Sequence, residues 1–170
     1  MSSNTKQRIL KDVNVRYNLQ PGDIGKVIYL HAVVYAEEYG LDHTFEGYVA
    51  SGLAEFAQSF NAIKNRLWVA EINEEIIGSI AVFGRSESDA QLRWFLVHPH
   101  YRGLGLGKLL FQEALQFCKK CEFKTVFLWT FSGLDAACYL YVSAGFEKTE
   151  EITHKIWGKT LTEERYDLQL

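Results

Sequence analysis

Hydrophobic residues recur along this chain at two spacings, one typical of helices and one typical of strands. Apolar positions three and four residues apart predict helices over residues 23–39, 44–60, 106–121 and 134–144. Alternating or continuous apolar runs predict strands over residues 12–19, 66–72, 75–83, 91–97, 125–131, 146–153 and 165–170. Asp23 is expected to cap the first helix and Gly40 to end it.

The order of these segments predicts the fold class. Two central strands are separated only by Asn73 and Glu74, which predicts a hairpin, and the strand over residues 91–97 is expected to add a third antiparallel member. The next helix leads to the strand over residues 125–131, and such a right-handed crossover joins parallel strands. We therefore expect a mixed α/β fold whose single sheet is mostly antiparallel, contains one parallel pair and packs against about four helices.

Composition narrows the class of protein. With 170 residues, 48% of them hydrophobic, the chain is expected to form one domain over residues 1–170, with the polar residues 1–11 as a flexible tail. A net charge of -3 disfavours nucleic acid as a partner. The sequence has no secretory signal and no apolar run of about 18 residues, which predicts a cytoplasmic protein that does not bind membranes. The cysteines at 118, 121 and 138 lack the spacing of a zinc site, so we expect reduced thiols and no metal.

Residues 91–121 contain the clearest candidate chemistry. A predicted strand ends at Pro99, and glycines at 103, 105 and 107 precede an amphipathic helix. The first turn of a helix has unpaired N–H groups and carries about half a positive charge. The stretch therefore predicts an anion site, with phosphate as the first ligand to consider.

Two common phosphate-binding patterns do not fit this loop. A Walker loop requires glycine five positions before Gly107 and Ser or Thr after Lys108, where this chain has Arg102 and Leu109. A dinucleotide fingerprint requires G-x-G-x-x-G and an acidic residue about 20 positions later, but the glycines alternate and Phe127 lies near that position.

A third pattern does fit. Residues 102–107 read R-G-L-G-L-G and match R-x-x-G-x-G, and residues 137–146 read A-C-Y-L-Y-V-S-A-G-F and match A-x-x-L-Y-x-x-x-G-F. Together these segments resemble the GNAT family of acetyl-CoA-dependent N-acetyltransferases, and the resemblance extends over about residues 12–170. Residues 157–158 and 164–168 further resemble GNAT domains that are fused to MarR-type DNA-binding regulators.

The resemblance implies a GNAT-like sheet in which the parallel strand pair splays, and acetyl-CoA as the cofactor. The strand backbone before the loop is expected to pair with the pantetheine arm, and the loop amides to hold the pyrophosphate with added charge from Arg102 and Lys108. Many family members have an asparagine before the next helix; residues 130–144 contain none, so Ser132 or Asp135 is the expected substitute. The expected cofactor-binding residues are Phe95, Leu96, Val97, Arg102, Gly103, Leu104, Gly105, Leu106, Gly107, Lys108, Ser132 and Asp135.

Tyr141 is the best candidate for a catalytic side chain, because it lies in the second motif and a tyrosine of pKa about 10 can donate to a departing thiolate. The general base is not identified. Glu71, Glu37 and Glu38 are candidates, each with an ordinary surface carboxylate as the alternative interpretation. We expect His31 to be a packing residue whose hydrogen bonds are satisfied.

The expected activity is acetyl transfer to a primary amine of a small molecule, amino acid or peptide. The alternative is a catalytically inactive acyl-CoA-binding or sensing module, and a DNA-linked regulator is disfavoured by the acidic charge balance. A homodimer is left open. The acceptor site is expected to be shaped by the first two helices, the loop after Phe83 and the connection over residues 153–161. Most aromatic residues of those helices are expected in the core and one or two in an acceptor pocket, from the set Tyr35, Tyr39, Phe45, Tyr48 and Phe56.

Overall fold

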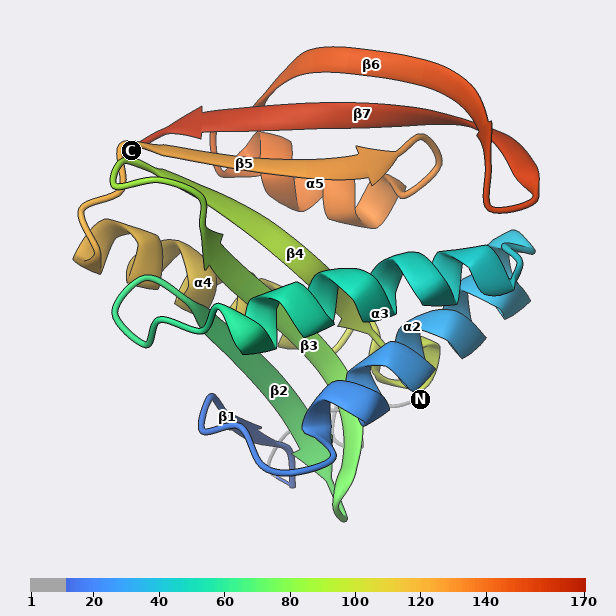
Figure 1. Cartoon of the computed structure of the whole chain (residues 1–170), viewed down its shortest axis with the longest axis horizontal. Coiled ribbons are helices and arrows are strands. Elements are labelled where there is room, and N and C mark those ends of the chain that lie inside the picture. Colours follow the sequence, from blue (N-terminus) through green and yellow to red (C-terminus); the bar gives the residue numbers. More distant parts are fainter. Residues whose placement is uncertain (1–11) are drawn as a thin grey trace.

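The computed structural model describes residues 12–170, so the predicted tail over residues 1–11 lies outside the described part. A seven-stranded sheet has the order β1-β2-β3-β4-β5-β7-β6 (Figure 1). Among the described strands only β4 and β5 pair in parallel, which confirms the predicted mixed α/β class. The strands are β1 (Asn14–Arg16), β2 (Arg66–Ile72), β3 (Glu75–Gly84), β4 (Asp89–Val97), β5 (Thr125–Phe131), β6 (Glu147–Ile156) and β7 (Lys159–Gln169).

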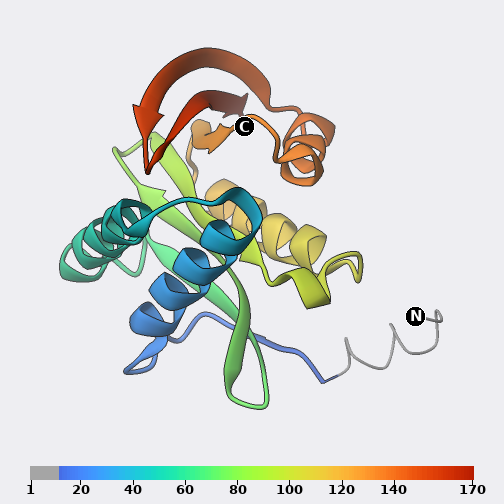
Figure 2. The same ribbon diagram turned by 90° about the vertical axis from the view of Figure 1, so that its right-hand side faces the viewer.

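The α-helices divide between the two faces of this sheet. The helices α2 and α3 cover one face, α4 covers the other, and α5 lies beside the β5 to β7 half (Figures 1 and 2). A single 3-10 turn, Pro99–Tyr101, follows β4. The helices are α2 (Asp23–Tyr39), α3 (His43–Gln58), α4 (Leu106–Lys120) and α5 (Asp135–Ser143).

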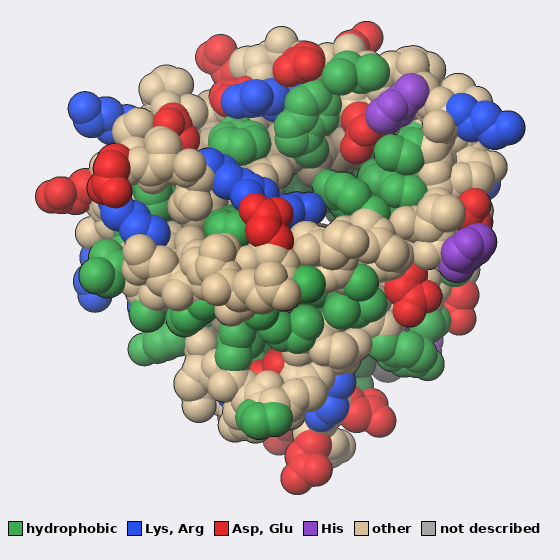
Figure 3. All heavy atoms as spheres, viewed as in Figure 1, with side chains coloured by type: hydrophobic (Ala, Val, Ile, Leu, Met, Phe, Trp, Pro, Cys, Tyr) green, Lys and Arg blue, Asp and Glu red, His purple; other side chains and the backbone are tan. Residues whose placement is uncertain are grey.

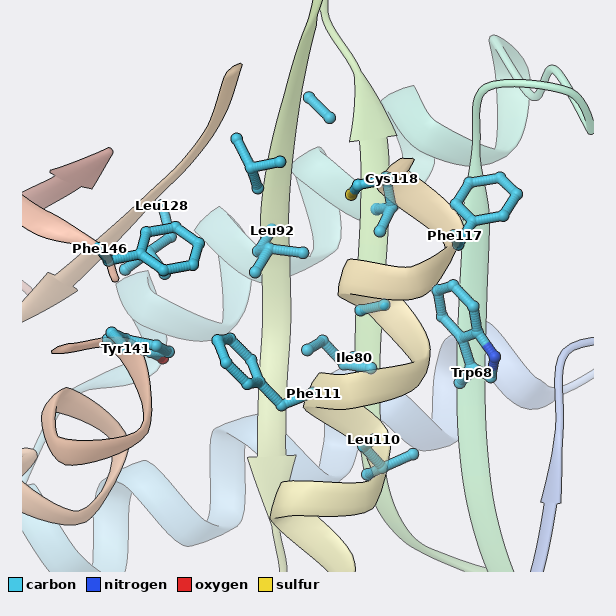
Figure 4. Packing of buried hydrophobic residues seen from close by; sticks show 14 of the residues in the cluster. Trp68, Ile80, Leu92, Leu110, Phe111, Phe117, Cys118, Leu128, Tyr141 and Phe146 are labelled. Atoms are coloured by element: carbon cyan, nitrogen blue, oxygen red, sulfur yellow. The ribbon is translucent and has the colours of Figure 1, made fainter. Parts of the chain in front are cut away.

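Two hydrophobic cores lie on opposite sides of the sheet. One packs α4 and α5 against the strands and contains Leu92, Phe111 and Tyr141 (Figure 4). The other packs α2 and α3 against the opposite face and contains Phe56 and Trp94. The interior strand β3 is buried along almost its whole length because both layers cover it.

The parallel pair separates part of the way along. β4 and β5 pair from Asp89 with Thr125 to Leu92 with Leu128. Beyond that point β4 stays paired with β3, whereas β5 stays paired with β7. The two strands therefore diverge, and residues 93–97 of β4 have an edge without a β5 partner in the described chain.

A β-bulge lies at the same place in β4. Ser79 pairs with Leu96 and Ala81 pairs with Arg93, so Trp94 and Phe95 together oppose one residue of β3. Trp94 has φ 49°, a left-handed conformation that is costly for a bulky side chain. The bulge sends Phe95 toward Phe111 of α4, whereas Trp94 packs on Phe56 of α3.

Two local predictions at the N-terminal end are wrong. The first strand covers only Asn14–Arg16, and Gly22, not Asp23, occupies the N-cap of α2. The Asp23 carboxylate instead accepts from the backbone N–H of Gln20 and pairs with Arg16 at 2.7 Å. The buried Asp23 carboxylate therefore joins β1 to α2 and neutralises the Arg16 guanidinium, and it does not act as a helix cap. Gly40 ends α2 with φ 65°, as predicted.

The expected connection over residues 153–161 is also wrong, because β6 and β7 form a long hairpin. Only Trp157 and Gly158 form the turn, with φ 52° and 80°. Its tip reaches the α2–α3 connection, where the N–H of Asp42 donates to the carbonyl of Trp157 at 3.1 Å. A Cβ at Gly158 would lie 2.8 Å from the Asp42 carboxylate, so the contact requires glycine.

Candidate active site

A cavity of about 690 Å³ opens where β4 and β5 diverge. Leu92 and Leu128, the last paired residues of the two strands, lie among its lining residues. The space-filling view shows hydrophobic, basic and acidic side chains around the hollow between α3 and the β5 to β7 strands (Figure 3). The cavity thus joins the glycine loop, the exposed edge of β4, α5 and the aromatic side of α2 and α3.

The glycine loop presents backbone N–H groups at one end of this cavity. Gly105 is the N-cap of α4 with φ 90°, and Gly103 has φ 71°. Among the described residues, nothing lies within 4 Å of a Cβ built on either glycine. The first turn of α4 therefore faces open space that a side chain would fill, which is the geometry of an anion cradle and fits a pyrophosphate.

Arg102 is already engaged in the structure. Its Nη1 and Nη2 each donate to the Glu38 carboxylate at 2.7 Å, and its Nε donates to the carbonyl of Val97 at 2.9 Å. The guanidinium therefore ties the glycine loop to α2 and to the end of β4. Lys108 also lines the cavity and adds a second positive charge near the loop.

Most of the residues predicted to bind the cofactor line this cavity. The loop residue Leu104 and the buried Leu106 are not among the cavity-lining residues, and neither is Ser132, whose N–H donates to Thr162 at 2.9 Å. Of the two substitutes for the family asparagine, Asp135 is the one on the cavity. The predicted residues that line it are Phe95, Leu96, Val97, Arg102, Gly103, Gly105, Gly107, Lys108, Asp135 and Tyr141.

Tyr141 projects from α5 into the same cavity. Tyr141 is 6% exposed, and its ring lies near that of Phe111 (Figure 4). The distances between ring centroids are 5.7 Å to Phe111 and 6.3 Å to Phe95. Burial raises the pKa of Tyr141, and the nearby hydroxyl of Tyr35 raises it further. The phenol therefore stays protonated at neutral pH and can act as a hydrogen-bond donor.

The aromatic residues of α2 and α3 contribute more to the cavity than expected. Four of the five line it, and only Phe56 is purely a core residue, so the expectation of one or two is wrong. Trp157, at the tip of the β6–β7 hairpin, packs against these aromatic residues. Its ring centroid lies 4.9 Å from that of Phe45 and 5.1 Å from that of Tyr48. The aromatic wall consists of Tyr35, Tyr39, Phe45, Tyr48 and Trp157.

His31 lines the cavity. The prediction that all its hydrogen bonds are satisfied is wrong. Its Nδ1 lies 2.8 Å from the carbonyl of Val27, so the ring proton is on Nδ1. Its buried Nε2 has no hydrogen-bond partner in residues 12–170. Burial lowers the pKa of His31 to about 4, which leaves a neutral ring with an unused acceptor.

None of the three carboxylates considered as a general base is among the lining residues. Glu71 accepts from Asn14 and Arg16 of β1, and Glu38 is paired with Arg102. Glu163 does line the cavity and lies 2.6 Å from His154. No sequence pattern pointed to Glu163, because the last strand was expected to begin only at residue 165.

In the described part of the chain, no group of three or more His, Cys, Asp or Glu residues is arranged to hold a metal ion. None of the helices within residues 12–170 has the length and apolar character that crossing a bilayer requires.

Comparisons with known proteins agree with this geometry. An N-acetyltransferase of Schizosaccharomyces pombe, itself uncharacterized, is 32% identical over 123 residues, which cover 71% of this chain and 74% of that protein. An acetyltransferase of Streptococcus agalactiae shares the fold with TM-score 0.77 at 20% identity, covering 94% of this chain and 99% of that one. YncA of Salmonella typhimurium, solved with its cofactor acetyl-CoA, shares the fold with TM-score 0.68 at 20% identity, covering 93% and 94%.

The sequence profile of the acetyltransferase (GNAT) family matches residues 32–146, from the middle of α2 to the end of the second motif. This range contains the glycine loop, the diverging strands and Tyr141. The expected enzyme class, an N-acetyltransferase, and the expected cofactor are those of the family. The chain therefore belongs to the acetyltransferase (GNAT) family.

Proposed function

We propose that this protein transfers an acetyl group from acetyl-CoA to a primary amine of a small molecule, amino acid or peptide. The observation that carries the proposal is the cavity itself, which joins an anion cradle at the start of α4 to Tyr141 through the open edge of β4. Acetyl-CoA supplies an acetyl thioester when it is bound. The residues described below hold it, orient it and receive the amine.

The start of α4 is proposed to hold the pyrophosphate. The space beside Gly103 and Gly105 is open, and the helix N-terminus favours negative charge. Lys108 adds charge, whereas the Arg102 guanidinium is shared with Glu38. The backbone therefore contributes most of the recognition, and Arg102 fixes the position of the loop.

The unpaired edge of β4 is proposed to hold the pantetheine arm. Residues 95–97 have no β5 partner within the described chain, so part of their N–H and C=O groups remains available for strand-like hydrogen bonds. The bulge at Trp94 sets the direction of these groups, because it changes the register just before them.

Tyr141 is proposed to donate a hydrogen bond from its phenolic oxygen to the departing sulfur. Because burial raises the pKa of Tyr141 above its ordinary value, and a thiol has a pKa of about 8.5, the phenol keeps its proton while it stabilises the negative sulfur. Its role is hydrogen-bond donation, and complete proton transfer from this residue is not required.

The acceptor amine must lose a proton before it attacks. A lysine-like amine has a pKa of about 10.4, so neutralising it at pH 7 costs roughly 4 to 5 kcal/mol. Glu163 and the free Nε2 of His31 are the acceptors that this structure adds to the cavity. Both are candidates for the general base, and no contact in the described structure favours one over the other.

An inactive acyl-CoA-binding or sensing module is the second candidate. It is favoured by one observation, that none of the carboxylates expected as the base lines the cavity. Thermal unfolding with and without acetyl-CoA tests binding, since a ligand at 100 times its dissociation constant stabilises by about 2.7 kcal/mol. Release of free thiol that depends on an added amine then supports the enzyme, and stabilisation without amine-dependent release supports the sensor. Absence of stabilisation contradicts both.

The remaining expectations stay predictions from the sequence. They are a cytoplasmic location, a homodimer as an open possibility, no nucleic acid partner, and the resemblance of the C-terminal residues to GNAT domains fused to MarR-type regulators.

A further inference from the structure

We propose that the acceptor amine carries a carboxylate, and that Arg93 binds it. This proposal rests on the proposed N-acetyltransferase function and narrows its acceptor to amino acids and related carboxylated amines. It is carried by three features of Arg93: where it lies, what keeps space for it, and the missing partner for its charge.

Arg93 lies in β4 immediately before the bulge and lines the cavity. The centre of its guanidinium is 4.6 Å from the Trp94 ring and 5.5 Å from the Tyr48 ring. Two aromatic faces thus hold the cation on the α3 side of the sheet. Neither aromatic contact uses a guanidinium N–H group in a hydrogen bond, so these donors remain available to a ligand.

Gly52 of α3 keeps the space that this guanidinium occupies. A Cβ at position 52 would lie 2.9 Å from both Nη1 and Nη2 of Arg93. Gly52 is not among the glycines with positive φ, so its backbone conformation does not require glycine. Glycine inside a helix costs about 1 kcal/mol relative to alanine. Glycine at position 52 therefore leaves room for the Arg93 guanidinium against α3.

The charge of Arg93 has no partner in the described part of the chain. No hydrogen bond from its guanidinium and no carboxylate within 4.0 Å is found there. Arg85 on the same sheet face, by contrast, donates to Gln91 and pairs with Glu55 at 2.9 Å. A half-buried cation without a counter-ion favours an anion, and a planar guanidinium matches a carboxylate with two parallel hydrogen bonds.

The anion at Arg93 is not the pyrophosphate of the donor. Arg93 precedes Val97 by four positions, so at about 3.3 Å per residue it lies roughly 13 Å from the end of β4 that leads to the glycine loop. Its side chain also faces α3, whereas the loop begins α4 on the opposite side of the sheet. The cavity therefore has one anion site at each end, and the second belongs to the acceptor. An amine without a carboxylate would be repelled by Arg93.

Matched acceptor pairs test the proposal. Thiol release from acetyl-CoA is measured with a panel of L-amino acids and with the corresponding L-amino acid amides, which differ only in the carboxylate. We expect kcat/KM to be higher for the acid than for the amide by roughly 10- to 100-fold, the range for hydrogen bonds to charged groups. Arg93→Met, which keeps side-chain length and removes charge, should reduce this ratio to about one. Arg85→Met is the matched control, because Arg85 is an aromatic-packed arginine outside the cavity, and it should keep the ratio.

Two measurements separate failure of this proposal from failure of the proposed function. Stabilisation of Arg93→Met by acetyl-CoA shows that the variant folds and that the donor site is intact. Calorimetry with N-acetyl-L-amino acids and their amides on the CoA-saturated protein measures the same preference without turnover. Equal use or equal binding of acids and amides by the wild type, or an unchanged ratio in Arg93→Met, overturns the carboxylate proposal while leaving the acetyltransferase intact. Failure of acetyl-CoA to bind overturns both.

Discussion

The hydroxyl of Ser79 on β3 donates a 2.7 Å hydrogen bond to the carbonyl of Trp94, the left-handed residue of the β4 bulge. Ser79 is fully buried, and it supplies the partner that the interrupted ladder no longer gives to this carbonyl. The bond holds the point where β4 leaves β5, and with it the exposed edge of residues 95–97 and the side chain of Arg93.

Ser79→Ala should destabilise the protein and also impair catalysis. Removing the hydroxyl leaves the Trp94 carbonyl unpaired, which costs about 1 to 3 kcal/mol for a buried group. Urea unfolding measures this cost, and Ser51→Ala at an exposed position of α3 is the control, with an expected change within about 0.5 kcal/mol. An unfolding free energy equal to that of the wild type would show that the bulge does not depend on this bond.

Gly105→Val should abolish stabilisation by acetyl-CoA. The variant places a β-branched side chain at φ 90° and fills the open space over the start of α4. The control is Gly47→Ala in α3, where a Cβ also meets nothing within 4 Å among the described residues and the φ is ordinary. Thermal unfolding with saturating acetyl-CoA compares them, and an undiminished shift in Gly105→Val would remove the loop from cofactor binding.

Tyr141→Phe should lower kcat and leave acetyl-CoA affinity nearly unchanged. The lost interaction is a hydrogen bond to a sulfur that becomes negative as it departs, so the expected loss is roughly 10- to 100-fold. Tyr29→Phe, at a position of α2 that is 69% exposed and outside the cavity lining, is the control. If Tyr141→Phe turns over as fast as the wild type, Tyr141 has no part in the chemistry.

His31 should make stability depend on pH between about 6.5 and 4. The pKa of His31 is 6.5 when unfolded and about 4 when folded, because burial disfavours the charged ring. Between these values the unfolded chain binds the extra proton, so stability is full above pH 6.5 and decreases as the pH falls toward 4. The free energy of unfolding should therefore decrease by about 3 kcal/mol over this pH range because of His31.

Urea unfolding of the wild type and of His31→Gln at several pH values measures this contribution. The glutamine variant does not titrate, so the difference in slope between the two proteins isolates His31 from the other ionisable groups. Parallel stability curves over this pH range would show that the His31 ring is not held neutral by burial.

Much of the fold was predictable because its elements carry strong local patterns. The predicted ranges of β2, β5 and α2 coincide with Arg66–Ile72, Thr125–Phe131 and Asp23–Tyr39, where apolar spacing and flanking breakers agree. The β6–β7 hairpin was predicted too short. Most of its residues are threonine, glutamate and lysine, and β6 is exposed along most of its length, so the alternation that indicates a strand is missing.

The donor side of the site was also predictable, whereas the acceptor side was not. The glycine loop and the Tyr141 segment are contiguous motifs, so their residues can be recognised from the sequence alone. The unpaired Nε2 of His31, the space at Gly52 and the charge of Arg93 depend on how α2, α3 and β4 pack together. A helical period shows that Tyr35 and Tyr39 share a face, but it does not show whether that face meets another layer or a cavity.

The most direct test of the proposed acetyltransferase activity is a product assay. The protein is incubated with acetyl-CoA and a panel of primary amines, and free thiol and acetylated amine are quantified by absorbance and mass spectrometry. The proposed function predicts equal amounts of thiol and N-acetyl product, formed only when both substrates are present. Stabilisation by acetyl-CoA with no acetylated product from any amine would contradict it and identify a binding module.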